Sequence, residues 1–254
     1  MYYYVYDEFI QEKRFERDVA LVENRLTDLG IQGKIARLAL FRDPLEMIRE
    51  EVRRGVKTVV AVGNDKTLRK VIQAAAGTGA AIGLIPIGKE DNYIATMLGV
   101  PQGAAACEVI SARIIEEMDL GVINSGRFLH RVVFPVSAGA KVVCDNEFSL
   151  YIPKDSVVSV RNLAQAEEDV AMAHPADGRL ELVIKNPIKG WFGKKEWRTS
   201  FLKFEEIVVI CEKLMKADVD GEIFEGNEFR VQVMSKQIKM ITGRARQFIS
   251  EDSQ

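Results

Sequence analysis

Hydrophobic and polar positions follow two alternating patterns along the first half of the chain. Short apolar runs predict buried strands at residues 2–6, 35–41, 58–62 and 81–87. Between them, apolar residues recur every three or four positions, which predicts helices at residues 12–29, 45–54, 67–75 and 92–98. Because strands that alternate with helices pair in parallel, this half is expected to form a parallel sheet with helices on both faces.

The pattern changes after about residue 119. Strand-like runs are now separated by turn residues such as Asp177-Gly178 and Asp220-Gly221, and they lie at 128–135, 149–152, 180–184, 204–210, 229–234 and 237–241. This pattern is typical of antiparallel sheets and predicts a sandwich or a partly closed barrel. The exception is the segment 157–168, which is interpreted as a short helix.

These patterns divide the chain into three parts. Residues 1–118 are predicted to form an α/β domain, and residues 119–243 a mostly antiparallel β-rich domain. Residues 244–254 are polar and are expected either to fray or to return to the first domain.

Composition narrows the classes of function. The 254 residues include 35 Lys or Arg and 37 Asp or Glu, so a net charge of -2 gives no electrostatic reason to expect a nucleic-acid partner. The three cysteines are far apart and lack metal-binding spacing, which predicts buried free thiols in a reducing compartment. The N-terminus lacks the pattern of a signal peptide, and no apolar run approaches the ~20 residues of a membrane span. We therefore expect a cytoplasmic protein.

Glycine follows two of the predicted buried strands. One strand leads into GNDKT at residues 63–67 and another into GKEDN at residues 88–92, each directly before a predicted helix. Because the amides at a helix N-terminus favour phosphate and glycine lets a ligand approach, both loops are candidate phosphate sites. Asp65 would be placed to hold Mg²⁺, and Thr67 to cap the helix or bind a phosphate oxygen. The alternative is a polar turn that binds nothing.

The order of several motifs resembles that of a known family. After GNDKT come IPIG at 85–88, NYIA at 92–95, LGVP at 98–101, MDLG at 118–121, DGRLE at 177–181 and DGE at 220–222. In this order they are similar to the landmarks of the diacylglycerol kinase catalytic-domain family. That lipid and sphingosine kinase group shares an ATP-binding fold with NAD kinases. The resemblance covers roughly residues 57–242 and implies a nucleotide-binding first domain, a β-rich second domain and a cleft between them.

The resemblance also implies roles for individual residues. The residues that match the family's two nucleotide loops are Gly63, Asn64, Asp65, Lys66 and Thr67 in the first loop, and Gly88 and Asn92 in the second. The family's catalytic or metal-binding carboxylate falls on Asp220 and Glu222.

The function implied by the resemblance is kinase activity: transfer of the γ-phosphate of ATP, with Mg²⁺, to a hydroxyl of a lipid or lipid-like molecule. Glu222 or Asp220 would take the hydroxyl proton, and Asp65 would be the metal ligand that positions Mg²⁺ and the triphosphate. Nucleotide and lipid acceptor are then the expected partners.

The chain also departs from the family's pattern. Asn64 and Lys66 replace glycines of the first loop, and Glu90-Asp91 brings two extra carboxylates to the second. The acidic stretch YDEF at residues 6–9 stands where the family has an Asn-Pro-x-Ser-Gly turn. The alternative is therefore a non-catalytic member that binds nucleotide or lipid as a sensor or scaffold, and the sequence leaves enzymatic activity open.

A basic and aromatic segment allows two interpretations. Residues 189–198, KGWFGKKEWR, contain both tryptophans of the chain. Contact with a membrane surface through Trp191, Phe192 and Trp197 is one interpretation, and it would add a peripheral membrane location. The other is a β-hairpin whose tryptophans pack on the core of the second domain.

Overall fold

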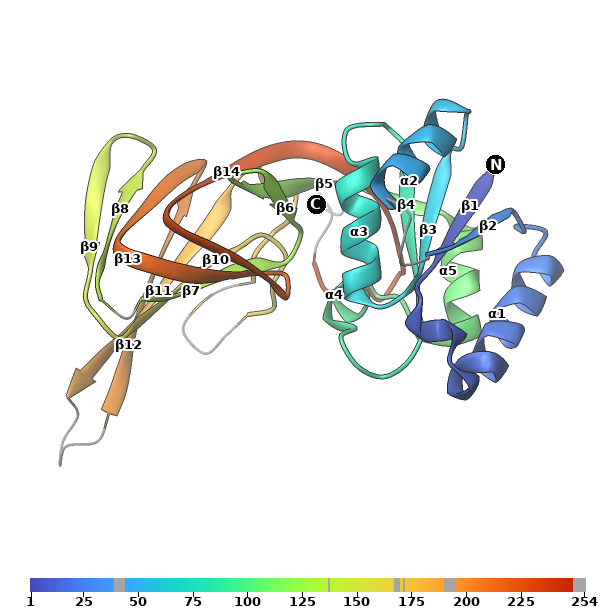
Figure 1. Ribbon diagram of the computed structural model, residues 1–254, viewed down its shortest axis with the longest axis horizontal. Coiled ribbons are helices and arrows are strands. Elements are labelled where there is room, and N and C mark those ends of the chain that lie inside the picture. The colour runs from blue at the N-terminus through green and yellow to red at the C-terminus, as the bar shows by residue number, and fades with distance from the viewer. Residues whose placement is uncertain (39–43, 137, 167–169, 171, 190–194, 249–254) are drawn as a thin grey trace. The chain divides into compact units, whose positions relative to one another are not determined.

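The computed structural model describes residues 1–38, 44–136, 138–166, 170, 172–189 and 195–248 (Figure 1). The chain divides into two compact units. The first contains Met1–Met118 and the chain from Lys236 onward, and the second contains Asp119–Ser235.

The sheet of the first unit is parallel. Its strands lie in the order β2-β1-β3-β4-β14, and β14 contributes only its C-terminal end. The strands are β1 (Tyr2–Tyr6), β2 (Lys34–Arg37), β3 (Thr58–Gly63), β4 (Ala81–Pro86) and β14 (Glu222–Thr242). Every residue of β3 and β4 is buried, as expected for parallel strands covered on both faces.

Helices cover both faces of this sheet (Figure 1). Helix α1 packs with α5 on one face, and α2 packs with α3 on the other. The helices are α1 (Glu16–Asp28), α2 (Pro44–Arg53), α3 (Asp65–Ala75), α4 (Tyr93–Met97) and α5 (Ala106–Ala112), with 3₁₀ turns at Phe9–Gln11, Lys13–Phe15 and Gly103–Ala105. The predicted α/β class is confirmed for this half of the chain.

The second unit is built from antiparallel strands, which confirms the predicted class of the second half. Strands β7, β10, β11 and β12 lie side by side in this order, and each is hydrogen-bonded to the next. Strand β13 pairs with β7, β8 and β14. The strands wholly in this unit are β6 (Gly126–Phe128), β7 (Arg131–Val136), β8 (Ala140–Cys144), β9 (Phe148–Ile152), β10 (Ser156–Arg161), β11 (Leu180–Lys189), β12 (Lys195–Phe204) and β13 (Glu206–Val219). Strands β5 (Ile114–Ile123) and β14 each belong partly to this unit and partly to the first. Alternate residues of these strands form one apolar core, in which the rings of Phe134 and Phe229 lie 5.3 Å apart.

One expected helix is wrong, and two expected strands are joined. In the described part of the segment 157–168 no helix forms, because its β-branched residues belong to β10, which pairs with β7 on one side and β11 on the other. The strands expected at 229–234 and 237–241 are one continuous strand, β14. Lys236 has a positive φ of 53°, but the strand continues through it. The prediction broke the strand there because Lys236 lies among polar residues.

The end of the chain is held on the first unit. Strand β14 passes from the second unit into the first at Lys236. Beyond it, the Gly243 N–H donates to the Leu98 carbonyl at 2.8 Å, and the Gln247 N–H donates to the Met97 carbonyl at 2.9 Å. Arg246 also forms an ion pair with Glu116 at 2.9 Å. These contacts fix the described part of the polar tail.

The cysteines behave as predicted. All three are buried free thiols, and burial raises the pKa of Cys107 and Cys144 to about 11. They therefore act as small apolar residues of the two cores. Within the described ranges, no helix is long and apolar enough to cross a bilayer.

Candidate functional site

In the first unit, the predicted loops lie at the carboxyl ends of three neighbouring strands. Strand β3 lies between β1 and β4, so Asp7, Gly63 and Gly88 follow adjacent strand ends. A direct hydrogen bond joins the two glycine loops, from the Asp65 N–H to the Asp91 carbonyl at 2.8 Å. Ligands of open parallel sheets bind outside this edge, so the fold brings the predicted loops to a suitable place.

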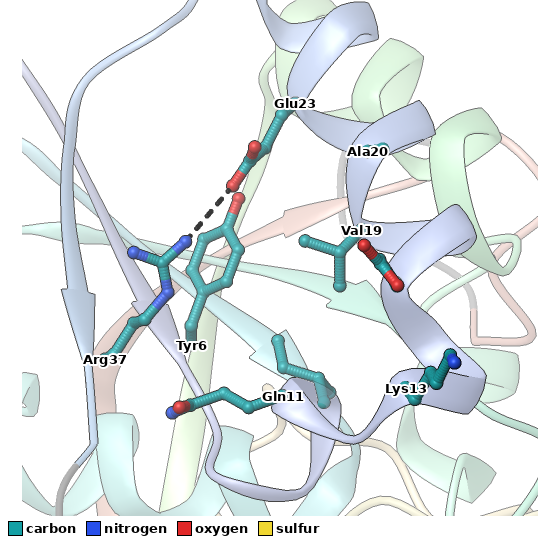
Figure 2. Close-up of a pocket in the computed structure, with 9 residues that line it drawn as sticks. Tyr6, Gln11, Lys13, Val19, Ala20, Glu23 and Arg37 are labelled. Atoms are coloured by element: carbon teal, nitrogen blue, oxygen red, sulfur yellow. Dashed lines mark ion pairs between the residues drawn. The ribbon is translucent and has the colours of Figure 1, made fainter.

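A pocket of about 540 Å³ lies beside this edge (Figure 2). Tyr6 and Arg37, at the ends of β1 and β2, form one wall, and Val19 and Glu23 of α1 form the other. The Arg37 guanidinium lies 3.7 Å from Glu23 and 5.7 Å from the centre of the Tyr6 ring. An aromatic ring, an aliphatic wall and both signs of charge suit a polar organic group better than a bare anion. The sequence patterns did not reveal this pocket, although Arg37 lies in the strand predicted at residues 35–41.

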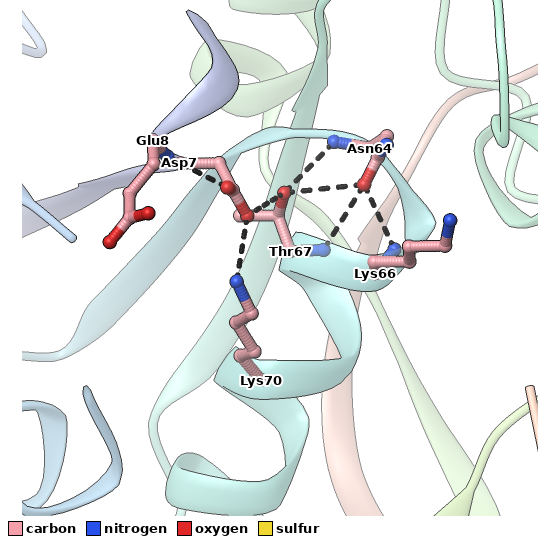
Figure 3. A network of polar contacts seen from close by, with 6 residues as sticks. All are labelled: Asp7, Glu8, Asn64, Lys66, Thr67 and Lys70. Carbon is pink, nitrogen blue, oxygen red and sulfur yellow. Dashed lines mark hydrogen bonds and ion pairs between the residues drawn. The ribbon is translucent and has the colours of Figure 1, made fainter. Parts of the chain in front are cut away.

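Within the acidic stretch after β1, Asp7 is paired with side chains of α3 (Figure 3). Asp7 is only 8% exposed, and its Oδ2 accepts hydrogen bonds from Thr67 Oγ1 at 2.8 Å and from Lys70 Nζ at 3.2 Å. Its Oδ1 accepts the Glu8 N–H at 2.7 Å. Lys70 was not predicted, but it lies three residues after Thr67 and therefore on the same helix face. The negative charge of Asp7 is thus paired with a cation from the neighbouring helix.

Asn64 closes the N-terminus of α3. Its Oδ1 accepts the N–H groups of Lys66 and Thr67 at 3.1 and 3.3 Å, while Thr67 Oγ1 accepts the Asn64 N–H at 3.1 Å. This reciprocal arrangement is a capping box. Gly63 makes it possible, because a Cβ there would lie 2.1 Å from Thr67 Oγ1. The amides of residues 65–67 therefore already donate to oxygens of the protein, where the sequence suggested phosphate.

Lys66 of the first loop and Asp91 of the second form an ion pair. Lys66 Nζ lies 2.9 Å from Asp91 Oδ2, and the side chains are 60% and 49% exposed. The hydrogen bond and the charge of Asp91 raise the pKa of Lys66. In the same loop, Asn92 Nδ2 donates to the Gly88 carbonyl at 2.7 Å. The Asn92 Oδ1 is buried and accepts no hydrogen bond from the described residues, so it can serve a ligand hydroxyl or water.

Asp65 connects α3 with α4. Its Oδ2 accepts the N–H of Ile94, which lies in the first turn of α4, at 2.9 Å. The described residues contain no cluster of three or more His, Cys, Asp or Glu side chains that could hold a metal. Mg²⁺ in phosphoryl-transfer sites is commonly held by one or two carboxylates together with the substrate's phosphates. Asp65 therefore fits Mg²⁺ as a ligand that acts together with a bound nucleotide.

The predicted carboxylates of the second unit occupy different environments. Asp220 lies in the turn between β13 and β14, and its carboxylate accepts the N–H groups of Leu129, His130 and Arg131 at 2.8, 3.2 and 2.7 Å. Glu222 opens β14 with an exposed side chain. Asp220 therefore holds a loop in place, whereas Glu222 faces solvent.

These features define a two-unit α/β protein with paired glycine loops at the carboxyl edge of a parallel sheet. Residues 3–123 match the family model described as the diacylglycerol kinase catalytic domain. The matched segment is just under half of the chain, so the first unit is similar to the diacylglycerol kinase catalytic-domain family.

Relatives agree with this similarity. A probable lipid kinase YegS-like protein of Pseudomonas aeruginosa is 33% identical over 90 residues, which are 35% of this chain and 30% of that protein. The probable lipid kinase YegS of Salmonella typhimurium is 33% identical over 104 residues, 39% of this chain and 34% of that protein. The match thus spans about a third of the length of these relatives. A solved diacylglycerol kinase structure from Bacillus anthracis, 16% identical, superposes with a TM-score of 0.77 over 96% of this chain and 97% of that one, which confirms the fold.

Proposed function

We propose that the chain transfers the γ-phosphate of ATP, with Mg²⁺, to a hydroxyl of a lipid or lipid-like molecule. The observation that carries this proposal is the junction of two glycine loops and Asp65 at the carboxyl edge of the sheet. That junction lies inside the segment matched to the kinase family. The relatives named as probable lipid kinases support a lipid acceptor.

In this proposal the first unit binds the nucleotide. The phosphates approach Gly63, Asn64, Lys66 and Thr67, and Asp65 shares their Mg²⁺. Asn92 Oδ1 accepts a ribose hydroxyl, since it is a buried acceptor without a partner among the described residues. The pocket at Tyr6 takes the base.

Closure of the first loop weakens this binding without preventing it. A phosphate that uses the amides of α3 has to displace the Asn64 side chain, whose cap is worth ~1 kcal/mol. Separating the exposed Lys66–Asp91 pair costs at most ~1 kcal/mol more. Together these terms reduce nucleotide affinity by roughly 5- to 30-fold. Lys66, once released, supplies a cation to the phosphates.

Glu222 is the better candidate for the general base. Both oxygens of Asp220 already accept backbone N–H groups, and moving that carboxylate would release the loop at residues 129–131. Glu222 lies two residues farther along, on the exposed side of the turn. We therefore assign proton removal to Glu222 and support of the turn to Asp220.

Phosphoryl transfer from radiolabelled ATP tests the proposal. Mixed micelles would offer diacylglycerol, sphingosine and phosphatidylglycerol separately, with Asp65→Asn as the matched variant because it keeps the acceptor for the Ile94 N–H. We expect Mg²⁺-dependent label in one lipid, reduced at least ~100-fold in Asp65→Asn. Equal transfer by the parent and the variant would contradict the assigned site.

A second candidate function is supported by the capped helix N-terminus. With the amides of residues 65–67 already bonded, a member of this fold could bind nucleotide or lipid as a sensor without transferring phosphate. The same assay separates the two functions when ATP binding is measured in parallel. Binding without transfer to any acceptor would favour the sensor.

A further inference from the structure

The hairpin of β11 and β12 continues beyond the apolar core of the second unit (Figure 1). Leu180, Leu182 and Ile184 of β11 belong to that core. Between the Asn186–Arg198 pair and the Lys189–Lys195 pair, the backbone pairing continues, but none of the residues of that core lies there. A two-stranded ribbon alone is only marginally stable in water, so this distal part is suited to contact something outside its own unit.

One face of the hairpin carries exposed aromatic side chains. Trp197 and Phe201 are four residues apart on β12, so both side chains project to the same face. They are 46% and 52% exposed. Trp197 lies opposite Pro187 on the neighbouring strand, which extends the apolar strip. The expectation that Trp197 packs into the core is therefore wrong, while Trp191 and Phe192 lie outside the described residues.

The charge of the hairpin contrasts with that of the whole chain. Residues 185–203 contain one acidic residue, Glu196, and six basic ones: Lys185, Lys189, Lys194, Lys195, Arg198 and Lys203. The chain as a whole has a net charge of -2. Of the six, Lys203 forms an ion pair with Asp177 at 2.6 Å, and Arg198 is exposed. The described part of the hairpin thus carries Lys185, Arg198 and Lys203 together with exposed aromatic side chains, which suits an anionic partner with an apolar layer.

We propose that the face of the β11–β12 hairpin that carries Trp197 and Phe201 docks on bilayers that contain anionic lipids. Trp197 and Phe201 would lie at the level of the headgroups, and the basic residues would meet the lipid phosphates. A bilayer offers both the apolar depth for the aromatic side chains and the negative surface for the basic ones. The biological role of this docking rests on the proposed function, because a lipid kinase has to reach an acceptor held in a membrane.

Vesicle co-sedimentation without nucleotide tests the docking surface. The full chain is mixed with phosphatidylcholine vesicles that either contain or lack phosphatidylglycerol. We expect binding to the anionic vesicles that weakens with salt, and little binding to the neutral ones. Replacing both aromatic residues, Trp197→Ala with Phe201→Ala, is expected to lower the partition coefficient more than ~10-fold. Lys185→Ala, which the strand register places on the same face as Trp197, should lower it roughly fivefold.

Tyr151→Ala is the matched control, since Tyr151 is an 80% exposed aromatic residue on β9. It should bind vesicles like the parent, and all variants should keep the parent's melting temperature. Unchanged binding by the hairpin variants, or equal binding to neutral vesicles, would overturn the proposal. Loss of self-association or of nucleic-acid binding in these variants, with vesicle binding intact, would also overturn it. Because no ATP is present, failure here is independent of failure in the phosphoryl-transfer assay.

Discussion

Asn64 contributes to the stability of α3 by capping its N-terminus. Its side chain accepts two amides that a nucleotide loop would offer to a ligand. We predict that Asn64→Ala lowers the free energy of unfolding by ~1 kcal/mol, whereas Asn64→Gly lowers it by only a few tenths. Urea unfolding of the three proteins measures both differences. Equal stability of the parent and the alanine variant would show that the cap contributes nothing.

Asp220 is a second residue whose role can be separated from catalysis. Its carboxylate accepts three backbone N–H groups, so Asp220→Ala leaves them without this acceptor and should cost about 1–3 kcal/mol. For a chain of this size that lowers the melting temperature by roughly 2–12 °C. Glu222→Gln is the control and should unfold like the parent, because the Glu222 side chain is exposed. Equal loss of stability in both variants would contradict the separate roles.

At the scale of elements, the return of the chain to the first unit depends on a close approach of two backbones. A Cβ at Gly243 would lie 1.9 Å from the Gly99 carbonyl oxygen. Gly243→Ala should therefore push the end of β14 away from the segment after α4, at a cost of about 1–3 kcal/mol. Thermal unfolding measures the loss. Gly30→Asn is the control, since a Cβ at Gly30 has no neighbour within 4 Å and Asn tolerates its φ of +65°. A Gly243→Ala protein as stable as the control would contradict the contact.

The elements show what sequence patterns can and cannot reveal. The buried parallel strands β3 and β4 were predictable, because burial on both faces requires unbroken apolar runs. β10 was not, because its residues alternate between the core and a half-buried face, and that mixture was compatible with a helix. The single strand β14 was divided in the prediction at Lys236, whose positive φ is a tertiary feature without a sequence signal of its own.

The candidate site was predictable to a similar extent. Gly63 and Asp65 follow from the strand–glycine–helix pattern, and the structure brings their loop together with the one at Gly88. The pairing of Lys66 with Asp91 and of Lys70 with Asp7 depends on the order of strands in the sheet. That order sets long-range neighbours, which a pattern along the chain does not contain. Lys66 and Asp91 therefore looked like separate departures from the family, although they compensate each other.

At the scale of the molecule, the fold of the solved diacylglycerol kinase structure is combined with a first glycine loop whose groups bond to one another. Each closing contact is weak: one helix cap and one exposed ion pair. If the proposed nucleotide site is correct, we expect this loop to bind nucleotide less tightly than a loop with glycines at both positions.

The measurement that tests this account most directly is thermal unfolding with and without millimolar Mg-ATP. The proteins to compare are the parent, Asn64→Gly and Asp65→Ala. A ligand at ~100 times its dissociation constant adds ~2.7 kcal/mol, which raises the melting temperature by about 5–10 °C for a chain of this size. We predict a rise in the parent, a larger rise in Asn64→Gly and none in Asp65→Ala. No shift in either the parent or Asn64→Gly would contradict the claim that this edge of the sheet binds nucleotide.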